Sequence, residues 1–197
     1  MTSHALRLAQ DPAADQLLSD DPFALLVGML LDQQFPMERA FAGPRIIAER
    51  LGTPDRLDPT VVAATDPEAF RALMTGPPAV HRYPGSMGER VQAVAATVVA
   101  SYGGDASLLW TSAADGADLL QRLMELPGFG RQKSQIFVAL LGKQLGVTPA
   151  GWKAAAGAYA EAGSRRSVAD VRDPATLAEV RAYKQEAKAA VRAAKGG

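Results

Sequence analysis

The sequence predicts an all-α fold, a bundle of helices in two closely packed lobes, and three observations support this prediction. Apolar residues recur at intervals of three and four along most of the chain, which is the spacing of one helix face. Proline and glycine stand where helices are expected to begin and end. No stretch shows the apolar–polar alternation of a half-buried strand. The 197 residues are enough to bury a hydrophobic core.

Aspartate–proline pairs mark helix starts in the first half of the chain. The aspartate caps free N–H groups, and proline needs no hydrogen-bond partner in a first turn. The pairs are Asp21-Pro22, Asp58-Pro59 and Asp66-Pro67. The helix after the first pair is expected to be buried and to end in the polar residues Gln33 and Gln34. A further helix is expected over 38–51, with a break at Pro44 and an end at Gly52.

Breaks rich in glycine and proline separate the helices of the second half. The expected elements are a loop over 76–86, a helix ending at Tyr102, a helix over 119–124, a glycine hairpin over 126–130, a helix from Arg131, a helix from Pro149 through Tyr159, a loop over 163–167, and a long helix from Pro174 toward Lys195. We therefore expect a partly helical segment over 1–20, a helical domain over 21–162 with its hairpin motif at 126–134, and a C-terminal loop and basic helix over 163–197 packed on that domain.

Composition excludes several kinds of site. The chain has no cysteine, which excludes disulfides, thiolate zinc sites, cysteine-held iron–sulfur clusters and a catalytic thiol. Residues 1–15 lack the pattern of a secretion signal, and no apolar run approaches the roughly 20 residues that span a bilayer. We expect a cytoplasmic monomer without membrane contact, associated with the nucleoid if the source is bacterial.

The segment Leu126-Pro-Gly-Phe-Gly carries the most informative chemistry. Gly128 and Gly130 allow a tight turn and a close approach of the backbone to a ligand. The helix that starts at Arg131 offers free N–H groups and the positive end of its dipole, a combination that binds phosphate. Arg131 and Lys133 lie in the first turn, where cations are unfavourable to the dipole, so an anionic partner is favoured. A plain link between two packed helices is the alternative.

The segment Leu126-Pro-Gly-Phe-Gly-Arg-Gln-Lys-Ser-Gln, the helix before it and the upstream Leu30-Leu-Asp-Gln-Gln resemble the HhH-GPD superfamily of base-excision DNA glycosylases over about residues 21–152. The resemblance implies a helix-hairpin-helix that grips the phosphates of double-stranded DNA and a glutamine that fills the gap left by a flipped base. The implied DNA contacts are Gln34, Leu126, Gly128, Phe129, Gly130, Arg131, Gln132, Lys133 and Ser134. The backbone carbonyls of Leu126 and Phe129 would hold a monovalent cation, sodium or potassium. No other cofactor is expected.

Two departures from the family pattern bear on the chemistry. Bifunctional members carry a lysine nucleophile where this chain has Gln132, and Lys133 lies about 100° away around the helix, so we expect no strong lyase activity. The family's catalytic aspartate is replaced by Thr148, or by Ala150 in ungapped counting. Hydrolysis favours a carboxylate near the sugar, because the sugar develops positive charge. Another acid would have to take this role.

The candidate replacement acids are Asp32 and Asp170, and a surface charge or a helix cap is the alternative interpretation of each. Gln33, Tyr83 and Trp152 are candidate base-pocket residues, because flipped bases are held by stacking and by hydrogen bonds to their edges. Core packing is the alternative for the two aromatic residues.

Basic residues recur along the final helix at Arg181, Lys184, Lys188, Arg192 and Lys195, with acids between them. Such a stripe can follow a phosphate backbone, and a solvated helix face has the same pattern. Two main functions are therefore expected. The first is a monofunctional glycosylase that removes an alkylated or deaminated base. The second is a non-catalytic module that recognises damaged or distorted DNA. A protein-interaction domain that uses the hairpin only as a turn is a third, weaker possibility.

Overall fold

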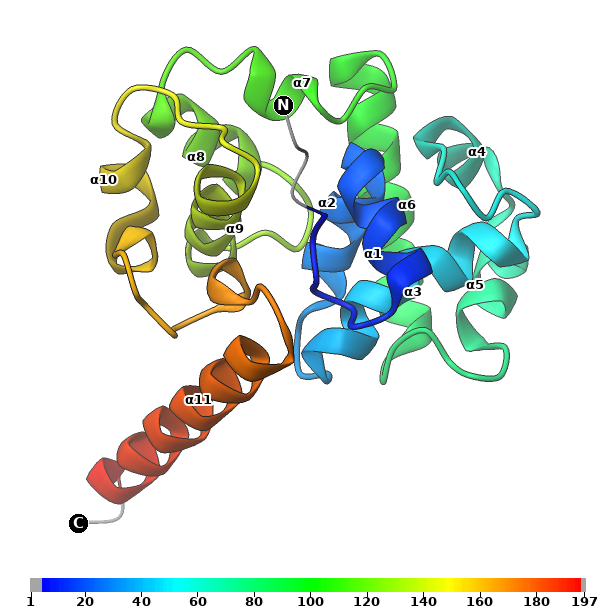
Figure 1. Ribbon diagram of the computed structural model, residues 1–197. Helices are drawn as coiled ribbons and strands as arrows, with labels where there is room; N and C mark the ends of the chain where they lie inside the picture. The colour runs from blue at the N-terminus through cyan, green and yellow to red at the C-terminus, as the bar shows by residue number, and fades with distance from the viewer. Residues whose placement is uncertain (1–4, 196–197) are drawn as a thin grey trace.

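The computed structural model describes residues 5–195, with side chains up to Ala193, and this part of the chain is all-helical, as the sequence predicts (Figure 1). Its elements are α1 (Pro12–Asp20), α2 (Pro22–Leu31), α3 (Met37–Arg50), α4 (Pro59–Ala64), α5 (Pro67–Thr75), α6 (Pro84–Tyr102), α7 (Leu108–Thr111), α8 (Gly116–Met124), α9 (Arg131–Gln144), α10 (Trp152–Ala156), the 3-10 helices η1 (Gly157–Ala160) and η2 (Val168–Asp170), and α11 (Pro174–Lys195). Within these residues, none of the helices combines the length and apolar character that a membrane crossing requires.

The aspartate–proline pairs start helices as expected. The carboxylate of Asp21 accepts hydrogen bonds from the N–H groups of Phe23 and Ala24 at 2.9 and 3.0 Å, which caps α2. Its second oxygen accepts from the N–H of Leu57 at 2.7 Å, so the same side chain anchors the loop before α4. Equivalent caps begin α4 and α5. Local capping chemistry therefore sets the starts of three helices.

Three predicted boundaries were wrong. Helix α3 runs through Pro44 without a break, and this proline is buried. Helix α6 begins at Pro84, so the preceding loop is shorter than predicted. The helix expected from Pro149 begins at Trp152, and it gives way to η1 at Gly157, whose φ is +60°.

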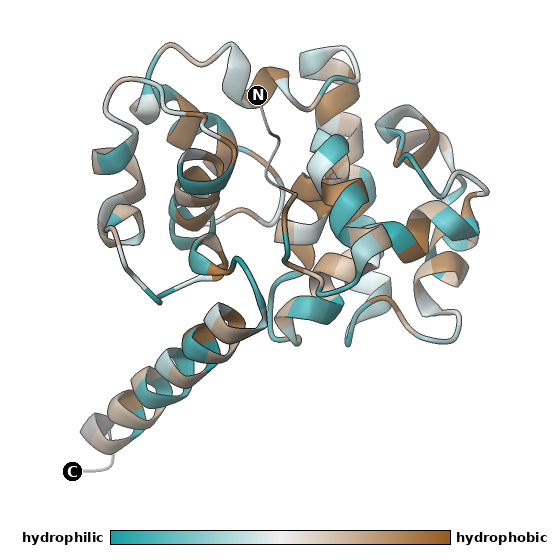
Figure 2. Ribbon diagram, viewed as in Figure 1, coloured by the Kyte–Doolittle hydropathy of each residue, from teal (hydrophilic) through white to brown (hydrophobic). Residues whose placement is uncertain are grey.

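The helices form two lobes around a continuous core (Figure 1). Helices α1 to α6 pack on one another in the first lobe, and α8 to α10 pack together with η1 and η2 in the second. Helix α2 lies at the centre of the first lobe, and its residues from Phe23 to Leu31 are all buried, in keeping with its hydrophobic colour in Figure 2. The hairpin over 126–130 joins α8 to α9 in the second lobe.

Helix α11 is packed on the domain only at its beginning, which corrects the predicted packing of the whole helix. Leu177 and Val180 are buried, whereas residues 185–193 are exposed. The helix extends away from the body of the protein (Figure 1). Its later turns consist of alanine, polar and charged residues and one exposed valine, which offer little apolar surface for burial. The side chain of Lys195, the last residue of the predicted basic stripe, lies outside the described residues.

Candidate functional site

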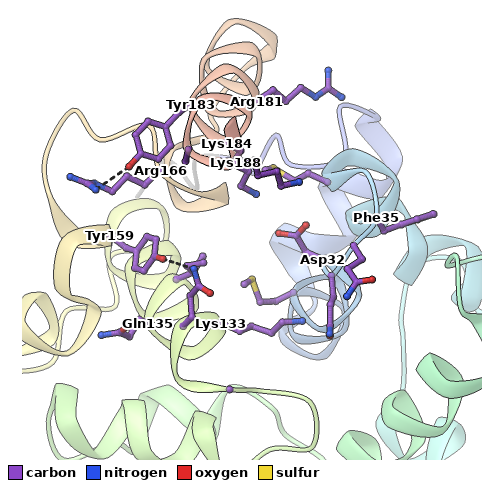
Figure 3. A pocket seen from close by; sticks show the side chains of 18 of the residues that line it. Asp32, Phe35, Lys133, Gln135, Tyr159, Arg166, Arg181, Tyr183, Lys184 and Lys188 are labelled. Atoms are coloured by element: carbon purple, nitrogen blue, oxygen red, sulfur yellow. Dashed lines mark hydrogen bonds between the residues drawn. The ribbon is translucent and has the colours of Figure 1, made fainter. Parts of the chain in front are cut away.

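A cleft of about 1440 Å³ lies where the two lobes and α11 meet (Figure 3). The first lobe contributes the turn between α2 and α3, residues 32–37. The second lobe contributes the hairpin and the first turns of α9, together with Tyr159 of η1. The middle turns of α11, from Arg181 to Lys188, line the remaining side. Segments far apart in the sequence therefore build one concave surface.

The charged residues of this cleft are nearly all cations. Its lining includes the seven basic residues Arg82, Arg131, Lys133, Arg166, Arg181, Lys184 and Lys188, and the single acidic residue Asp32. The whole chain has a formal net charge of zero. Folding has therefore concentrated positive charge in this cleft of a neutral protein, and such a surface attracts anionic ligands.

The two hairpin glycines serve different needs. Gly128 has a φ of +83°, and a Cβ atom there would lie 2.7 Å from Cδ1 of Leu30, so the fold itself requires glycine. Gly130 has extended backbone, and a Cβ atom there would meet nothing within 4 Å. No side chain caps α9, whose first residue follows Gly130. The open space at Gly130 thus lies beside free helical N–H groups.

The first turn of α9 divides its side chains between the cleft and the core. Arg131 and Gln132 are exposed and line the cleft, and Nε2 of Gln132 donates to Oη of Tyr159 at 2.9 Å. Ser134 is fully buried, which corrects its predicted DNA contact. The side chains of Leu126 and Phe129 are also buried, so only their backbone groups are available to a ligand.

Lys133 links the two lobes. Its Nζ donates a hydrogen bond of 2.6 Å to the carbonyl oxygen of Leu30 in the last turn of α2, where the helix dipole favours a cation. Burial lowers the pKa of Lys133 to about 8, and the nearby carboxylate of Asp32 opposes this shift. Lys133 was expected among the DNA contacts; in the structure its amine lies inside the cleft.

Asp32 caps the C-terminus of α2, and its carboxylate points into the cleft toward the lysines of α11 (Figure 3). Burial raises the pKa of Asp32, and the positive charges of Lys184 and Lys133 act against this increase. In the described residues, no lysine or arginine lies within 4 Å of its carboxylate oxygens. The cleft therefore holds a half-buried carboxylate that has nearby cations but no direct ion pair.

His81 supports the turn that follows Asp32. Nε2 of His81 donates to the carbonyl oxygen of Gln33 at 2.9 Å, and Nδ1 accepts from the N–H of Tyr83 at 3.1 Å. This arrangement corresponds to neutral His81, and burial lowers its pKa. The ring of Phe35 lies 4.8 Å from that of His81. Gln34 is exposed at the tip of the turn with a φ of +53°, a conformation that costs a residue other than glycine about 1 kcal/mol or more.

Asp170, Trp152 and Tyr83, which the sequence offered as catalytic or base-pocket residues, lie outside the cleft. Asp170 accepts hydrogen bonds from Nζ of Lys143 at 2.6 Å and from the N–H groups of Arg166 and Ser167, and its side chain is only 6% exposed. It caps η2 and pairs with a buried lysine, which corrects its assignment as a catalytic acid.

Trp152 packs its ring against Gly142 of α9, where a Cβ atom would lie 2.4 Å from the indole. Tyr83 is 47% exposed and does not line the cleft. Both are therefore corrected as base-pocket residues. Thr148 and Ala150, the positions at which the family pattern places its aspartate, lie in an exposed loop outside the cleft. Of the base-pocket candidates predicted from the sequence, only Gln33 lines the cleft, and of the candidate acids only Asp32 does.

Sequence reasoning did not single out Phe35, Arg166 or Tyr183, although all three line the cleft. Oη of Tyr183 accepts a hydrogen bond from Arg166 at 3.1 Å, and the same guanidinium pairs with Glu161 at 3.2 Å. No sequence signal identifies these residues, because nothing local shows that the middle of α11 lies across the cleft from the turn between α2 and α3.

The hairpin carbonyls are compatible with a monovalent cation. The Leu126 carbonyl oxygen accepts a hydrogen bond from the N–H of Phe129 at 3.1 Å and keeps a second lone pair. Within the described residues, no hydrogen bond to the Phe129 carbonyl oxygen is present. Oxygen ligands of this kind suit sodium or potassium, and the cation stays a prediction.

Compared with known proteins, the chain matches no protein-family model and no curated protein. The arrangement of the cleft is therefore the basis on which function is inferred.

Proposed function

We propose that this protein binds double-stranded DNA across the cleft between its lobes and removes a damaged base by hydrolysing the N-glycosidic bond. The observation that carries this proposal is the cleft itself, in which seven basic side chains surround one half-buried carboxylate. The resemblance of the hairpin and of the Asp32-Gln33-Gln34 turn to base-excision glycosylases supports it. These two segments lie 90 residues or more apart in the sequence, and both line the same cleft.

Binding would begin at the hairpin and at the cations of the rim. The free N–H groups of the first turn of α9 and the side chain of Arg131 would hold a backbone phosphate, and the open space beside Gly130 would let that phosphate approach. On the opposite side of the cleft, Gln34 would enter the duplex where the base is extruded. The rigid support of this turn by His81 would keep Gln34 in place during insertion.

Asp32 would supply the chemistry. A base extruded into the cleft brings its sugar toward this carboxylate, whose negative charge stabilises the positive charge that develops on the sugar. The same carboxylate would orient the attacking water and accept its proton. An acid with a raised pKa suits the second task, because a more basic carboxylate takes up a proton more readily.

The non-catalytic alternative has its own supporting observation. The loop that carries Thr148 and Ala150 lies away from the cleft and holds no acid between positions 146 and 152. If Asp32 served only to cap α2, the protein would bind distorted duplex without breaking a bond. The two functions differ in whether base release occurs and whether it depends on Asp32.

A base-release assay distinguishes them. Duplex oligonucleotides that carry one damaged base are incubated with protein, and alkali then cleaves the strand at each abasic site. We expect release by the wild type and its loss in Asp32→Asn, whereas Asp55→Asn, a change at a 94% exposed side chain, serves as the matched control. Asp32→Asn should fold normally, since it removes a partly buried charge. Duplex binding without release of any base would favour the non-catalytic module.

Binding is tested separately by its salt dependence. The basic residues of the cleft lining that form no ion pair in the described structure, apart from the buried Lys133, are Arg82, Arg131, Lys184 and Lys188. If each meets one phosphate, the logarithm of the affinity falls against the logarithm of the salt concentration with a slope of about −3 to −4. A slope near zero would contradict duplex binding in this cleft.

A further inference from the structure

We infer that the base removed is one that leaves as an anion, such as a deaminated base, and not a cationic N-alkylated purine. This inference rests on the proposed function and deepens it by naming the substrate class. It is carried by two independent features of the cleft, namely the charges around Asp32 and the state of the aromatic rings in the lining.

The first feature is the charge balance of the cleft. Lys184 and Lys133 are the two cations that most lower the pKa of Asp32, so both act on the region into which its carboxylate points. Neither forms an ion pair within the described residues. Arg181 and Arg166 differ in this respect, since they pair with Glu38 and Glu161. The ammonium groups of Lys184 and Lys133, neither of them neutralised by an ion pair in the described residues, therefore act on one carboxylate, which leaves an excess of positive charge where a flipped base would lie.

The excess of positive charge favours a base that leaves as an anion. In hydrolysis, the water oxygen forms a bond to C1′ while the bond from C1′ to the base nitrogen breaks, and the bonding electron pair goes to the base. The water proton passes to Asp32. A neutral base thus leaves with a negative charge and then takes a proton from Lys133 or from solvent. Neighbouring ammonium groups stabilise that negative charge as it develops.

A cationic base leaves as a neutral molecule and gains nothing from these ammonium groups. Before the reaction, its own positive charge is repelled by the same lysines. Cationic ligands are bound instead by open faces of aromatic rings. The cleft therefore opposes entry of a cationic base and does not assist its departure.

The second feature is that aromatic faces in the cleft are already covered by guanidinium groups. The Arg39 guanidinium lies 4.8 Å from the centre of the Phe35 ring. The Arg166 guanidinium lies 5.8 Å from the centre of the Tyr183 ring. Tyr159 is held through its hydroxyl by Gln132. Phe35 and Tyr183 thus each carry one of the protein's own guanidinium groups over a ring face, and Tyr159 is fixed at its hydroxyl, so the three rings do not form an open cage for a cationic base.

The amide groups of Gln33, Gln132 and Gln135 complete the lining with hydrogen-bond donors and acceptors suited to the edges of a neutral base. Uracil and hypoxanthine fit this description. Uracil carries two carbonyl oxygens and hypoxanthine one, which accept hydrogen bonds, and each base loses a ring proton easily enough to be a competent anionic leaving group.

The test compares leaving groups of different charge in one duplex sequence. Single-turnover release of uracil, hypoxanthine and 7-methylguanine is measured and divided by the spontaneous rate of each base. We expect the rate enhancement for uracil or hypoxanthine to exceed that for 7-methylguanine by about tenfold or more, which is the effect of a single nearby charge. Lys184→Gln should reduce that advantage, and Lys184→Arg should restore it. Lys153→Gln, at an exposed position outside the cleft, is the control.

The outcomes separate the inference from the proposed function. Release of 7-methylguanine with an equal or larger enhancement would overturn the inference and leave a glycosylase. An advantage for neutral bases that persists unchanged in Lys184→Gln and in Lys133→Met would overturn the electrostatic argument. Absence of release from every duplex, together with salt-dependent binding, would overturn both proposals.

Discussion

Replacing Lys133 with methionine tests whether the cleft is built around a buried cation. Methionine keeps most of the length of the side chain but removes the ammonium group. In the folded protein the pKa of Lys133 is about 8, against 10.5 for an unperturbed lysine. Between these values the unfolded chain binds more protons than the folded one, so the lysine makes stability rise with pH.

The size of this effect follows from the pKa shift. One pKa unit corresponds to about 1.4 kcal/mol, so burial of the charged lysine lowers the free energy of unfolding by about 3 kcal/mol at pH 7. The penalty is nearly absent once pH approaches 10.5. Between pH 7 and pH 10, the wild type should therefore gain about 2.5 kcal/mol relative to Lys133→Met. Lys133→Met also loses the hydrogen bond to the Leu30 carbonyl oxygen. This loss changes the free energy of unfolding by the same amount at pH 7 and at pH 10, so it does not alter the expected gain.

The assay is urea denaturation of both proteins at pH 7, 8, 9 and 10. Taking the difference between them removes the titration of all groups they share. Lys153→Met, at an exposed lysine of α10, is the matched control, and its difference from the wild type should stay constant within about 0.5 kcal/mol. A difference for Lys133→Met that is equally constant over this range would refute the burial of a charged lysine in the cleft.

Three further outcomes are expected. Gly130→Ser should keep the stability of the protein, because serine is a good N-cap, and it should weaken duplex binding by filling the space beside the helix N-terminus. Unchanged duplex binding by a folded Gly130→Ser would contradict the phosphate site. Gly128→Ala, by contrast, should destabilise the protein by about 1 to 3 kcal/mol, because Gly128 has a positive φ. The rate of base release should rise with pH as Asp32 ionises, at a pKa above the usual 3.8, and it should decline above about pH 8 as Lys133 loses its proton. A rate that is constant from pH 7 to 10 would contradict the role of the Lys133 ammonium group. Asp170→Ala should destabilise by about 3 to 5 kcal/mol in urea denaturation, since it leaves a buried lysine without its partner, and a loss below 1 kcal/mol would contradict its structural role.

The elements that the sequence predicted correctly are those set by short-range chemistry. Asp21 caps α2 through N–H groups two and three residues away, so the pair with Pro22 is sufficient to predict the helix start. Gly128 is required by its own positive φ and by the turn that it forms. Pro44 was misjudged because the helix continues through this buried proline, and no local pattern reveals its burial.

The same distinction explains the site predictions. The sequence offered both Asp32 and Asp170 as candidate replacement acids. The structure separates them by their surroundings: Asp170 has hydrogen-bond donors from Lys143 and from the backbone of η2, whereas Asp32 faces a cleft. Trp152 was likewise undecided until its ring was seen against Gly142.

The sequence by itself determined the all-helical fold, the hairpin and the absence of any cysteine-based chemistry, because these depend on residue type and on neighbours within a few positions. Only the tertiary structure decided which charges meet. Lys133 reaches the carbonyl oxygen of Leu30 across 103 positions of sequence, and Lys184 lies near Asp32 because the middle of α11 runs beside the cleft. Side chains converge through the packing of helices that are distant in the chain, and that packing is set by the shapes of buried faces, which local patterns do not encode.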